Sequence, residues 1–248
     1  DIMLAIDVST SMLAEDLKPN RLEAAKDVAA EFINGRPNDN IGITLFAGET
    51  FTQCPLTVDH AVLLDMIHNI KCGLIEDGTA VGMGVANAVT RLKDSKAKSK
   101  VIILLTDGTN NKGDISPLTA AEIAKSFGIR VYTIGVGTNG MAPYPYPVGN
   151  TVQYINMPVE IDEKTLTQIA GTTDGNYFRA TSNSKLKEVY EEIDKLEKTK
   201  LNVKEYSKRE EDYRWFALAA FLCVLLEVLL RNSILKKIPY ECFVNRDL

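Results

Sequence analysis

The sequence that decides the fold is Asp1-Ile-Met-Leu-Ala-Ile-Asp-Val-Ser-Thr-Ser-Met12. Residues 2–7 are apolar up to the final aspartate, and Asp7 begins a series of oxygen-bearing side chains that continues with Ser9 and Ser11. Such a run is too short for a helix and too apolar for a strand with one wet face, so it predicts a central strand of a parallel sheet covered on both sides. Ligands of open α/β sheets bind beyond the carboxyl ends of the strands, where Asp7 is expected to lie.

Strand and helix patterns alternate along the first 199 residues. Further buried strands are expected at 41–47, 101–106, 130–137 and 177–180, with a short antiparallel edge strand at 51–53. Helices are expected between them, beginning near Asn20, Ala61, Thr79, Ser116, Asp162 and Leu186. This alternation predicts a Rossmann-like α/β fold, a doubly wound and mostly parallel six-stranded sheet with one short antiparallel edge strand.

The composition narrows the class of protein. The chain has 248 residues, of which 45% are hydrophobic and 25% charged, which suits one α/β domain with an appendage. A net charge of −5 and the lack of a basic stripe with interleaved aromatic residues argue against nucleic-acid binding. The four cysteines form no CxxC pair and only two histidines are present, so no zinc site is predicted. Free thiols are the favoured interpretation of Cys54 and Cys72, with a disulfide between them as the alternative in an oxidising compartment.

The composition changes after residue 199. We expect a domain at 1–199, a charged connector at 200–214, a transmembrane helix at 215–235 and a short tail at 236–248. The twenty-one residues at 215–235 could just cross a bilayer. Glu227 and Arg231 argue against this, because a charge at the centre of a membrane helix costs ~2.5–3.5 kcal/mol. An amphipathic or partner-binding helix is the alternative.

Two weaker indications concern the segment upstream of Asp1 and the orientation of the predicted transmembrane helix. The chain begins inside a predicted strand without an initiator methionine, so we expect that a segment upstream of Asp1 has been cut away. Basic residues on the two sides of 215–235 are nearly equal in number, so the positive-inside rule leaves the orientation undecided.

Oxygen-bearing side chains from three separate segments are expected to converge. They are Asp7, Ser9, Ser11, Thr79 and Asp107. If the first and fourth strands are neighbours, the two aspartates face each other across the crevice at the sheet edge. Two carboxylates and three hydroxyls, without nitrogen or sulfur, favour a hard divalent cation such as Mg²⁺ or Mn²⁺. One coordination position would then remain for a carboxylate from a protein partner.

This pattern, Asp-x-Ser-x-Ser followed by a later threonine and a later aspartate, resembles the metal-ion-dependent adhesion site of von Willebrand factor A domains. All five elements are present without substitution, and the resemblance covers about residues 1–199. The resemblance implies that Ser9, Ser11 and Thr79 bind the cation through their hydroxyls, whereas the two aspartates act mostly through water. It also implies that Thr79 shifts between direct and water-mediated binding.

A second resemblance extends to about residue 238. The insertion at 139–158, the helix entry at 159–163, the strand at 177–180 and the Leu-Leu-Arg-Asn-x-Ile-Leu segment are similar to the BatA membrane proteins of the bacterial aerotolerance operon. This resemblance implies membrane helices upstream of Asp1 and a periplasmic A domain held at the bacterial inner membrane. It also implies that sibling Bat proteins and a MoxR-type ATPase are partners in an envelope-stress or aerotolerance system.

The insertion at 139–158 is longer than the usual connections of such folds, and it holds four prolines and three tyrosines. It follows the carboxyl end of the strand at 130–137, at the edge of the sheet where the metal is expected. We therefore expect Tyr144, Tyr146 and Tyr154 to form a partner-binding rim beside the cation. The alternative is a surface loop of polyproline character without a role.

These features predict a membrane-anchored, cation-dependent protein-binding module, of adhesion or scaffold type, without catalytic activity. The enzyme alternative is a magnesium-dependent phosphotransferase or phosphatase of the haloacid-dehalogenase type, with Asp7 as nucleophile. That chemistry generally uses a second aspartate two residues later as general acid, and Ser9 occupies this position. A third interpretation is a purely structural ion, but such a site needs no open position and is more often a calcium cage.

Overall fold

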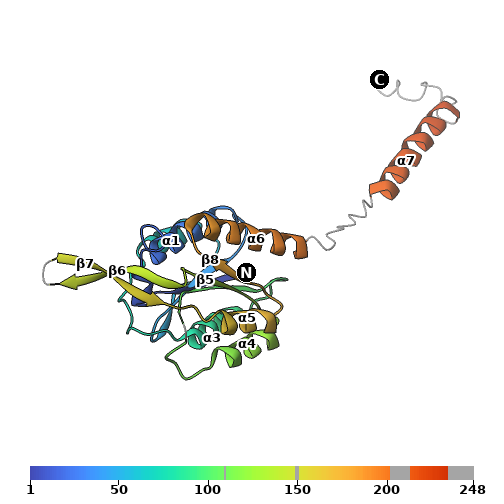
Figure 1. The fold of residues 1–248 in the computed structure, drawn as a ribbon. Helices are drawn as coiled ribbons and strands as arrows, with labels where there is room; N and C mark the ends of the chain where they lie inside the picture. Colours follow the sequence, from blue (N-terminus) through green and yellow to red (C-terminus); the bar gives the residue numbers. More distant parts are fainter. Residues whose placement is uncertain (109, 149–150, 202–212, 234–248) are drawn as a thin grey trace, which may run out of the picture. The chain divides into compact units, whose positions relative to one another are not determined.

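The computed structural model of the chain describes all residues except 109, 149–150, 202–212 and 234–248 (Figure 1). The chain divides into two compact units, Asp1–Val203 and Lys204–Leu248. Most of the connector predicted at 200–214 and all of the tail predicted at 236–248 lie outside the described residues.

Strands and helices alternate through the described part of the first unit. The strands are β1 (Ile2–Asp7), β2 (Ile41–Phe46), β3 (Thr50–Thr57), β4 (Val101–Thr106), β5 (Arg130–Val136), β6 (Gly140–Val148), β7 (Thr151–Val159) and β8 (Tyr177–Ala180). The helices are the short 3-10 helix η1 (Thr10–Leu13) and the α-helices α1 (Arg21–Asn34), α2 (His60–His68), α3 (Val81–Leu92), α4 (Pro117–Ser126), α5 (Glu163–Thr172) and α6 (Asn183–Leu201).

Six of these strands form one sheet in the order β3-β2-β1-β4-β5-β8. Its neighbouring strands pair in parallel except for β3, which is antiparallel to β2. The predicted doubly wound six-stranded sheet is therefore confirmed, although its antiparallel edge strand spans Thr50–Thr57 rather than 51–53. Because β1 and β4 are neighbours at the point where the strand order reverses, their carboxyl ends border the crevice in which such sheets bind ligands.

The central strands send alternate side chains into two apolar cores. In β1, Leu4 and Ile6 pack on the side of α1, α2 and α6, whereas Met3 and Ala5 pack on the side of α3, α4 and α5. Figure 1 shows α1 and α6 on one face of the sheet and α3, α4 and α5 on the other. All residues of β1 are buried, as predicted for a strand covered on both faces.

The predicted start of α1 is confirmed in detail. The Asn20 side chain accepts a hydrogen bond from the Glu23 N–H at 2.8 Å, so Asn20 is the N-cap. Ser116 caps α4 in the same way, with its Oγ 3.1 Å from the Thr119 nitrogen. These caps fix where the helices begin, and α1 begins directly beside the carboxyl end of the sheet.

The insertion at 139–158 forms a β-hairpin, which the sequence analysis did not assign. β6 and β7 pair antiparallel from Gly140 opposite Val159 onward. Pro143, Pro145 and Pro147 alternate along β6. Successive residues of a strand direct their N–H and C=O groups to opposite sides, so the three missing N–H groups all belong to one edge. The Pro143 carbonyl on this edge accepts a hydrogen bond from the Glu15 N–H, outside the hairpin, so the edge is the one away from β7. Prolines at such an edge are compatible with a strand, and for this reason a high proline content did not exclude one.

The second unit contains helix α7 (Tyr213–Ser233). None of the helices in the described part of the chain has the length and apolarity needed to span a bilayer. The transmembrane helix predicted at 215–235 is thus not supported, and its last two residues lie outside the described part.

Candidate metal centre

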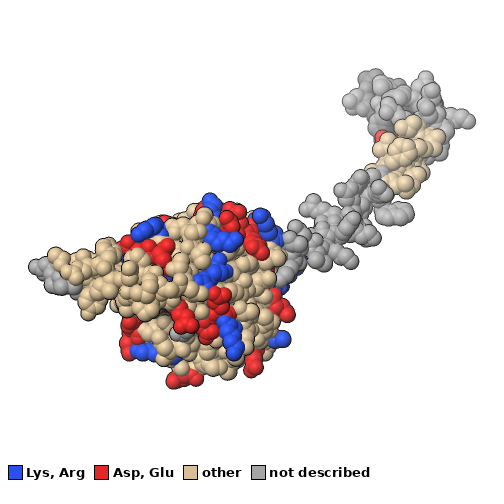
Figure 2. Space-filling model, in the orientation of Figure 1, with Lys and Arg blue, Asp and Glu red and all other residues tan. Residues whose placement is uncertain are grey.

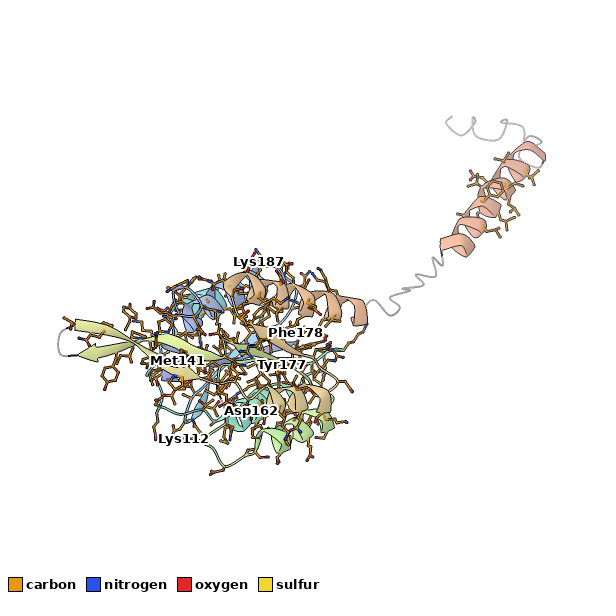
Figure 3. The ribbon with its side chains drawn as sticks, in the orientation of Figure 1. Lys112, Met141, Asp162, Tyr177, Phe178 and Lys187 are labelled. Carbon is orange, nitrogen blue, oxygen red and sulfur yellow. The ribbon has the colours of Figure 1, made fainter. Side chains whose placement is uncertain are left out.

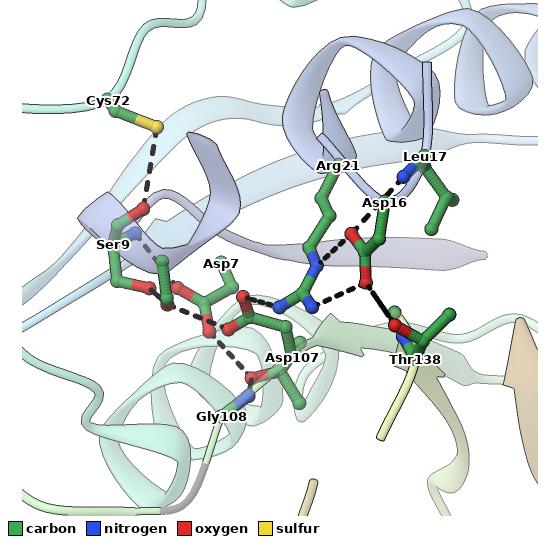
Figure 4. Close-up of polar contacts among 12 residues, drawn as sticks. Asp7, Ser9, Asp16, Leu17, Arg21, Cys72, Asp107, Gly108 and Thr138 are labelled. Carbon is green, nitrogen blue, oxygen red and sulfur yellow. Dashed lines mark hydrogen bonds and ion pairs between the residues drawn. The ribbon is translucent and has the colours of Figure 1, made fainter. Parts of the chain in front are cut away.

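The carboxyl ends of β1 and β4 bring the predicted carboxylates and hydroxyls together (Figure 4). Asp7 is the last residue of β1 and Asp107 directly follows β4. The Ser11 hydroxyl donates to Asp107 Oδ1 at 2.8 Å, and Ser9 Oγ lies 2.9 Å from Ser11 Oγ. Thr79 lines a cavity of about 200 Å³ together with Ser11 and Asp107. The structure therefore places all five predicted ligand residues around one site.

The loop after β1 is organised by Asp7. The Ser9 N–H donates to Asp7 Oδ1 at 2.9 Å, and the Thr106 hydroxyl donates to Asp7 Oδ2 at 2.6 Å. Asp7 is completely buried. Its carboxylate thus fixes the course of the loop that carries Ser9 and Ser11, and it adds a negative charge to the site.

A second aspartate joins this loop to the segment that carries Thr79. Asp77 accepts hydrogen bonds from the Thr10 N–H at 3.0 Å and from the Thr10 hydroxyl at 2.8 Å. The Thr79 N–H donates to Asn111 Oδ1 at 2.8 Å. A Cβ added at Gly108 would lie 3.2 Å from Thr79 Oγ1, so the Thr79 hydroxyl packs closely against the chain that follows β4. These contacts hold the three segments of the site together.

A buried arginine that the sequence analysis missed completes the site. Arg21 is 1% exposed, and its Nη1 donates to Asp107 Oδ2 at 2.6 Å. Its Nε and Nη2 donate to the two carboxylate oxygens of Asp16 at 2.7 and 2.6 Å. Asp16 also accepts hydrogen bonds from the Thr138 N–H at 2.7 Å and hydroxyl at 3.1 Å. This network connects Asp107 to the segment that leads into β6 (Figure 4).

The sequence does contain a signal for Arg21. Arg21 is the first residue of α1, where a positive charge is unfavourable because the helix dipole is positive at this end. Its neighbours Leu22 and Ala25 are core residues, so a basic residue at this position indicates a carboxylate partner. Asp16 and Asn111 give no comparable signal, because short polar residues are ordinary in loops.

The buried carboxylates raise one another's affinity for protons. Burial, together with the nearby charge of Asp107, raises the pKa of Asp7 to about 7. Burial also raises the pKa of Asp107, although the Arg21 guanidinium opposes this effect. The carboxylates of Asp16 and Asp107 share the single positive charge of Arg21, and Asp7 adds a third carboxylate beside them. A bound cation would balance the remaining negative charge and favour the ionised forms.

The donor set fits a hard cation. In the part of the chain that the structure describes, no group of three or more His, Cys, Asp or Glu side chains could hold a metal, so a cation here depends on hydroxyl oxygens. The Cys72 thiol donates to the Ser9 carbonyl at 3.4 Å. Burial and the charge of Asp7 raise the pKa of Cys72 to about 12, so the thiol stays protonated and is a poor metal ligand. Cys54 and Cys72 are both free, which excludes the disulfide alternative in this structure.

The family follows from this fold and this pattern of side chains. Residues 1–192 match the von Willebrand factor type A domain family. The chain belongs to this family.

Solved structures similar to this chain include two bacterial proteins and a mussel protein. BatB from Bacteroides thetaiotaomicron is 34% identical with a TM-score of 0.70, covering 79% of this chain and 98% of that one. An aerotolerance-related membrane protein from Bacteroides fragilis is 34% identical with a TM-score of 0.68, covering 78% and 98%. Proximal thread matrix protein 1 from the mussel byssus, described with a zinc-occupied MIDAS motif, is 26% identical with a TM-score of 0.62, covering 79% and 45%.

Curated relatives of this A domain are longer than the chain. A UPF0353 protein of Mycolicibacterium paratuberculosis is 33% identical over 205 residues, which are 76% of this chain and 58% of that protein. An uncharacterized protein of Borreliella burgdorferi is 27% identical over 240 residues, which are 96% and 70% of the two lengths. The chain thus spans little more than half of the mycobacterial relative.

The structure of this A domain separates the three predicted rim tyrosines. Tyr144 and Tyr146 line a second hollow, of about 330 Å³, together with Met157. Tyr154 lies opposite Pro145 in the hairpin and so belongs to the other face of the ribbon. A hydrogen bond to Glu15 raises the pKa of the Tyr154 phenol.

Proposed function

We propose that this von Willebrand factor A domain is a divalent-cation-dependent protein-binding module of adhesion or scaffold type. The observation that carries the proposal is the convergence of Ser11, Thr79 and Asp107 on one cavity, with Ser9 hydrogen-bonded to Ser11 and Asp7 buried beside them. The mussel protein, in which zinc occupies the corresponding kind of motif, supports a cation as the ligand.

The proposed ion is Mg²⁺ or Mn²⁺, since the donors are hydroxyl and carboxylate oxygens. Ser9, Ser11 and Thr79 would hold the ion through their hydroxyls, and Asp7 and Asp107 would act mostly through water. The bound cation would supply a positive centre for an Asp or Glu carboxylate of a protein partner. Tyr144, Tyr146 and Tyr154 are the proposed rim of this interface.

A more specific proposal concerns the system in which the domain works. Similarity to BatB and to an aerotolerance-related membrane protein supports a place in a bacterial envelope-stress or aerotolerance system. The partners would be sibling Bat proteins and a MoxR-type ATPase, and the domain would work at the inner membrane on its periplasmic side. This membrane association rests on the similarity and not on a helix of the described residues. The assignment to BatA within the Bat group stays a prediction.

Catalysis is not part of the proposal. The nucleophile of a dehalogenase-type phosphotransferase must reach its substrate, but Asp7 is completely buried. Both of its carboxylate oxygens accept hydrogen bonds, from the Ser9 N–H and from the Thr106 hydroxyl. These contacts suit a residue that organises a loop better than one that attacks a phosphate.

The proposed function is tested by pull-down experiments from bacterial membranes. The chain should capture a partner in Mg²⁺ and lose the same partner both in EDTA and in the Asp107→Ala variant. Asp114→Ala is the matched control, because Asp114 is exposed and does not line the cavity, and it should retain the partner. Capture that survives both EDTA and Asp107→Ala, or magnesium-dependent hydrolysis of a phosphomonoester, would overturn the proposal.

A further inference from the structure

β6 and β7 form an uncharged arm, residues 140–159. This segment contains no Asp, Glu, Lys or Arg, and the arm accordingly lacks charge colours in Figure 2. Met141, labelled on the arm in Figure 3, is 60% exposed, and Tyr146 and Met157 are 51% and 43% exposed. Clustered exposed apolar side chains of this kind mark an interaction surface.

The apolar hollow of about 330 Å³ lies between this arm and the loop after β1. Tyr144 and Met157 line it from the arm, and its lining includes no charged residue. Ser11, Pro158 and Val159 line both the hollow and the cavity of the candidate metal centre. The two depressions are therefore direct neighbours that share a wall, and one bound segment can reach both.

We propose that the hollow receives a large apolar side chain from the same partner segment whose Asp or Glu carboxylate binds the cation. This inference rests on the proposed function and specifies the chemistry of its partner. The cation favours a carboxylate, whereas the uncharged hollow beside it disfavours a second charge, because burying an unpaired charge is costly. Pockets for whole ligands extend from roughly 300 to 1,000 Å³, so a hollow at the lower end of this range suits a single bulky side chain.

The hairpin geometry provides a matched control. Met157 lies opposite Ala142 on the face that lines the hollow, whereas Val152 lies opposite Pro147 on the other face. Met157 and Val152 are both exposed, at 43% and 59%, so neither replacement removes a core residue. A loss of affinity confined to Met157 would identify the hollow itself and not the arm as a whole.

The first experiment identifies the recognition pattern without knowledge of the natural partner. Displayed random peptides of about ten residues with one fixed glutamate are bound to the chain in Mg²⁺ and eluted with EDTA. Large apolar residues should be enriched at one constant distance from the glutamate. Peptides eluted by EDTA without such enrichment would overturn this inference and leave the proposed function standing. If EDTA released no peptide, both would fail.

The second experiment locates the apolar side chain. Affinities are measured by fluorescence anisotropy for a selected peptide and for its version with the apolar residue changed to serine. Met157→Ser should weaken binding of the first peptide roughly tenfold and leave that of the second nearly unchanged. Val152→Ser should leave both affinities nearly unchanged. If both variants weakened binding of the first peptide equally, the hollow would not be the site of the apolar residue. The same would follow if Met157→Ser weakened binding of the two peptides equally.

Discussion

Arg21 Nη1 lies 2.6 Å from Asp107 Oδ2, and the two side chains are 1% and 0% exposed. The same guanidinium binds both carboxylate oxygens of Asp16, so one positive charge serves two buried carboxylates. One of these carboxylates borders the candidate metal centre, and the other accepts hydrogen bonds from Thr138. Arg21 is therefore a structural residue of the first unit and also a positioning residue for Asp107.

Arg21→Gln is expected to lower the free energy of unfolding by about 3–5 kcal/mol, because it leaves two buried carboxylates without their countercharge. Urea unfolding measures the effect. Lys187→Gln is the control, because the Lys187–Glu31 ion pair, at 2.5 Å, is exposed and should contribute little. Similar small changes in both variants would contradict the role assigned to Arg21.

Mg²⁺ or Mn²⁺ should raise the melting temperature of the wild-type chain and leave that of Asp107→Ala unchanged. A ligand that binds only the folded state stabilises it by about 2.7 kcal/mol at a hundredfold excess over Kd. Thr79→Ser keeps a hydroxyl and should keep most of the effect, whereas Thr79→Val should lose it. Calorimetry with and without EDTA gives the measurement, and an undiminished shift in Asp107→Ala would exclude this residue from the cation site.

The neighbourhood of Asp7 and Asp107 could be predicted because it follows from simple regularities. Each residue ends a short apolar run, and right-handed crossovers with short connections place successive strands in few possible orders. The ion pairs of Arg21 could not be predicted in the same way, because contacts between residues far apart in the sequence leave no periodic pattern. The hairpin at 140–159 was missed because proline normally indicates a break in a strand. Only the pairing with β7 and the outward hydrogen bond of the Pro143 carbonyl show that these prolines lie at an edge.

Stability in acid should depend on Glu197. This residue is 2% exposed, and its carboxylate accepts hydrogen bonds from the Tyr132 hydroxyl at 2.6 Å and the Ser99 hydroxyl at 2.9 Å and pairs with Arg130. Burial raises the pKa of Glu197, but these hydrogen bonds outweigh burial and hold the pKa below its usual range. Ionised Glu197 therefore stabilises the fold above its unfolded pKa of about 4.3, and this contribution is lost as the pH falls toward the folded pKa.

The unfolding free energy of the wild-type chain should accordingly fall as the pH drops below about 5, and more steeply than that of Glu197→Gln. Urea titrations at several pH values compare the two. Tyr132→Phe removes one of the hydrogen bonds and should give an intermediate slope. Identical slopes for all three proteins would show that Glu197 is not the source of acid sensitivity.

Two helical glycines should respond to alanine with opposite signs. Alanine in place of glycine in a helix normally stabilises by roughly 0.5–1 kcal/mol. A Cβ at Gly171 in α5 would meet no atom within 4 Å, so Gly171→Ala should show this gain. A Cβ at Gly82 in α3 would lie 2.0 Å from the Ile115 carbonyl oxygen. Overpacking of this kind costs about 1–3 kcal/mol, so Gly82→Ala should be destabilising, as measured by urea unfolding. A gain in both variants would contradict the close packing of α3.

The alternating prolines of β6 protect one edge of the exposed apolar arm against strand addition. A free strand edge normally acts as a template on which a second chain adds its own strand. Along the edge of β6 that faces away from β7, Pro143, Pro145 and Pro147 offer carbonyl acceptors but no N–H donors, and the Pro143 carbonyl already binds the Glu15 N–H at 2.8 Å. A regular ladder cannot extend from such an edge. The arm can therefore present apolar side chains to a partner while its backbone resists, along this edge of β6, the strand addition that begins aggregation.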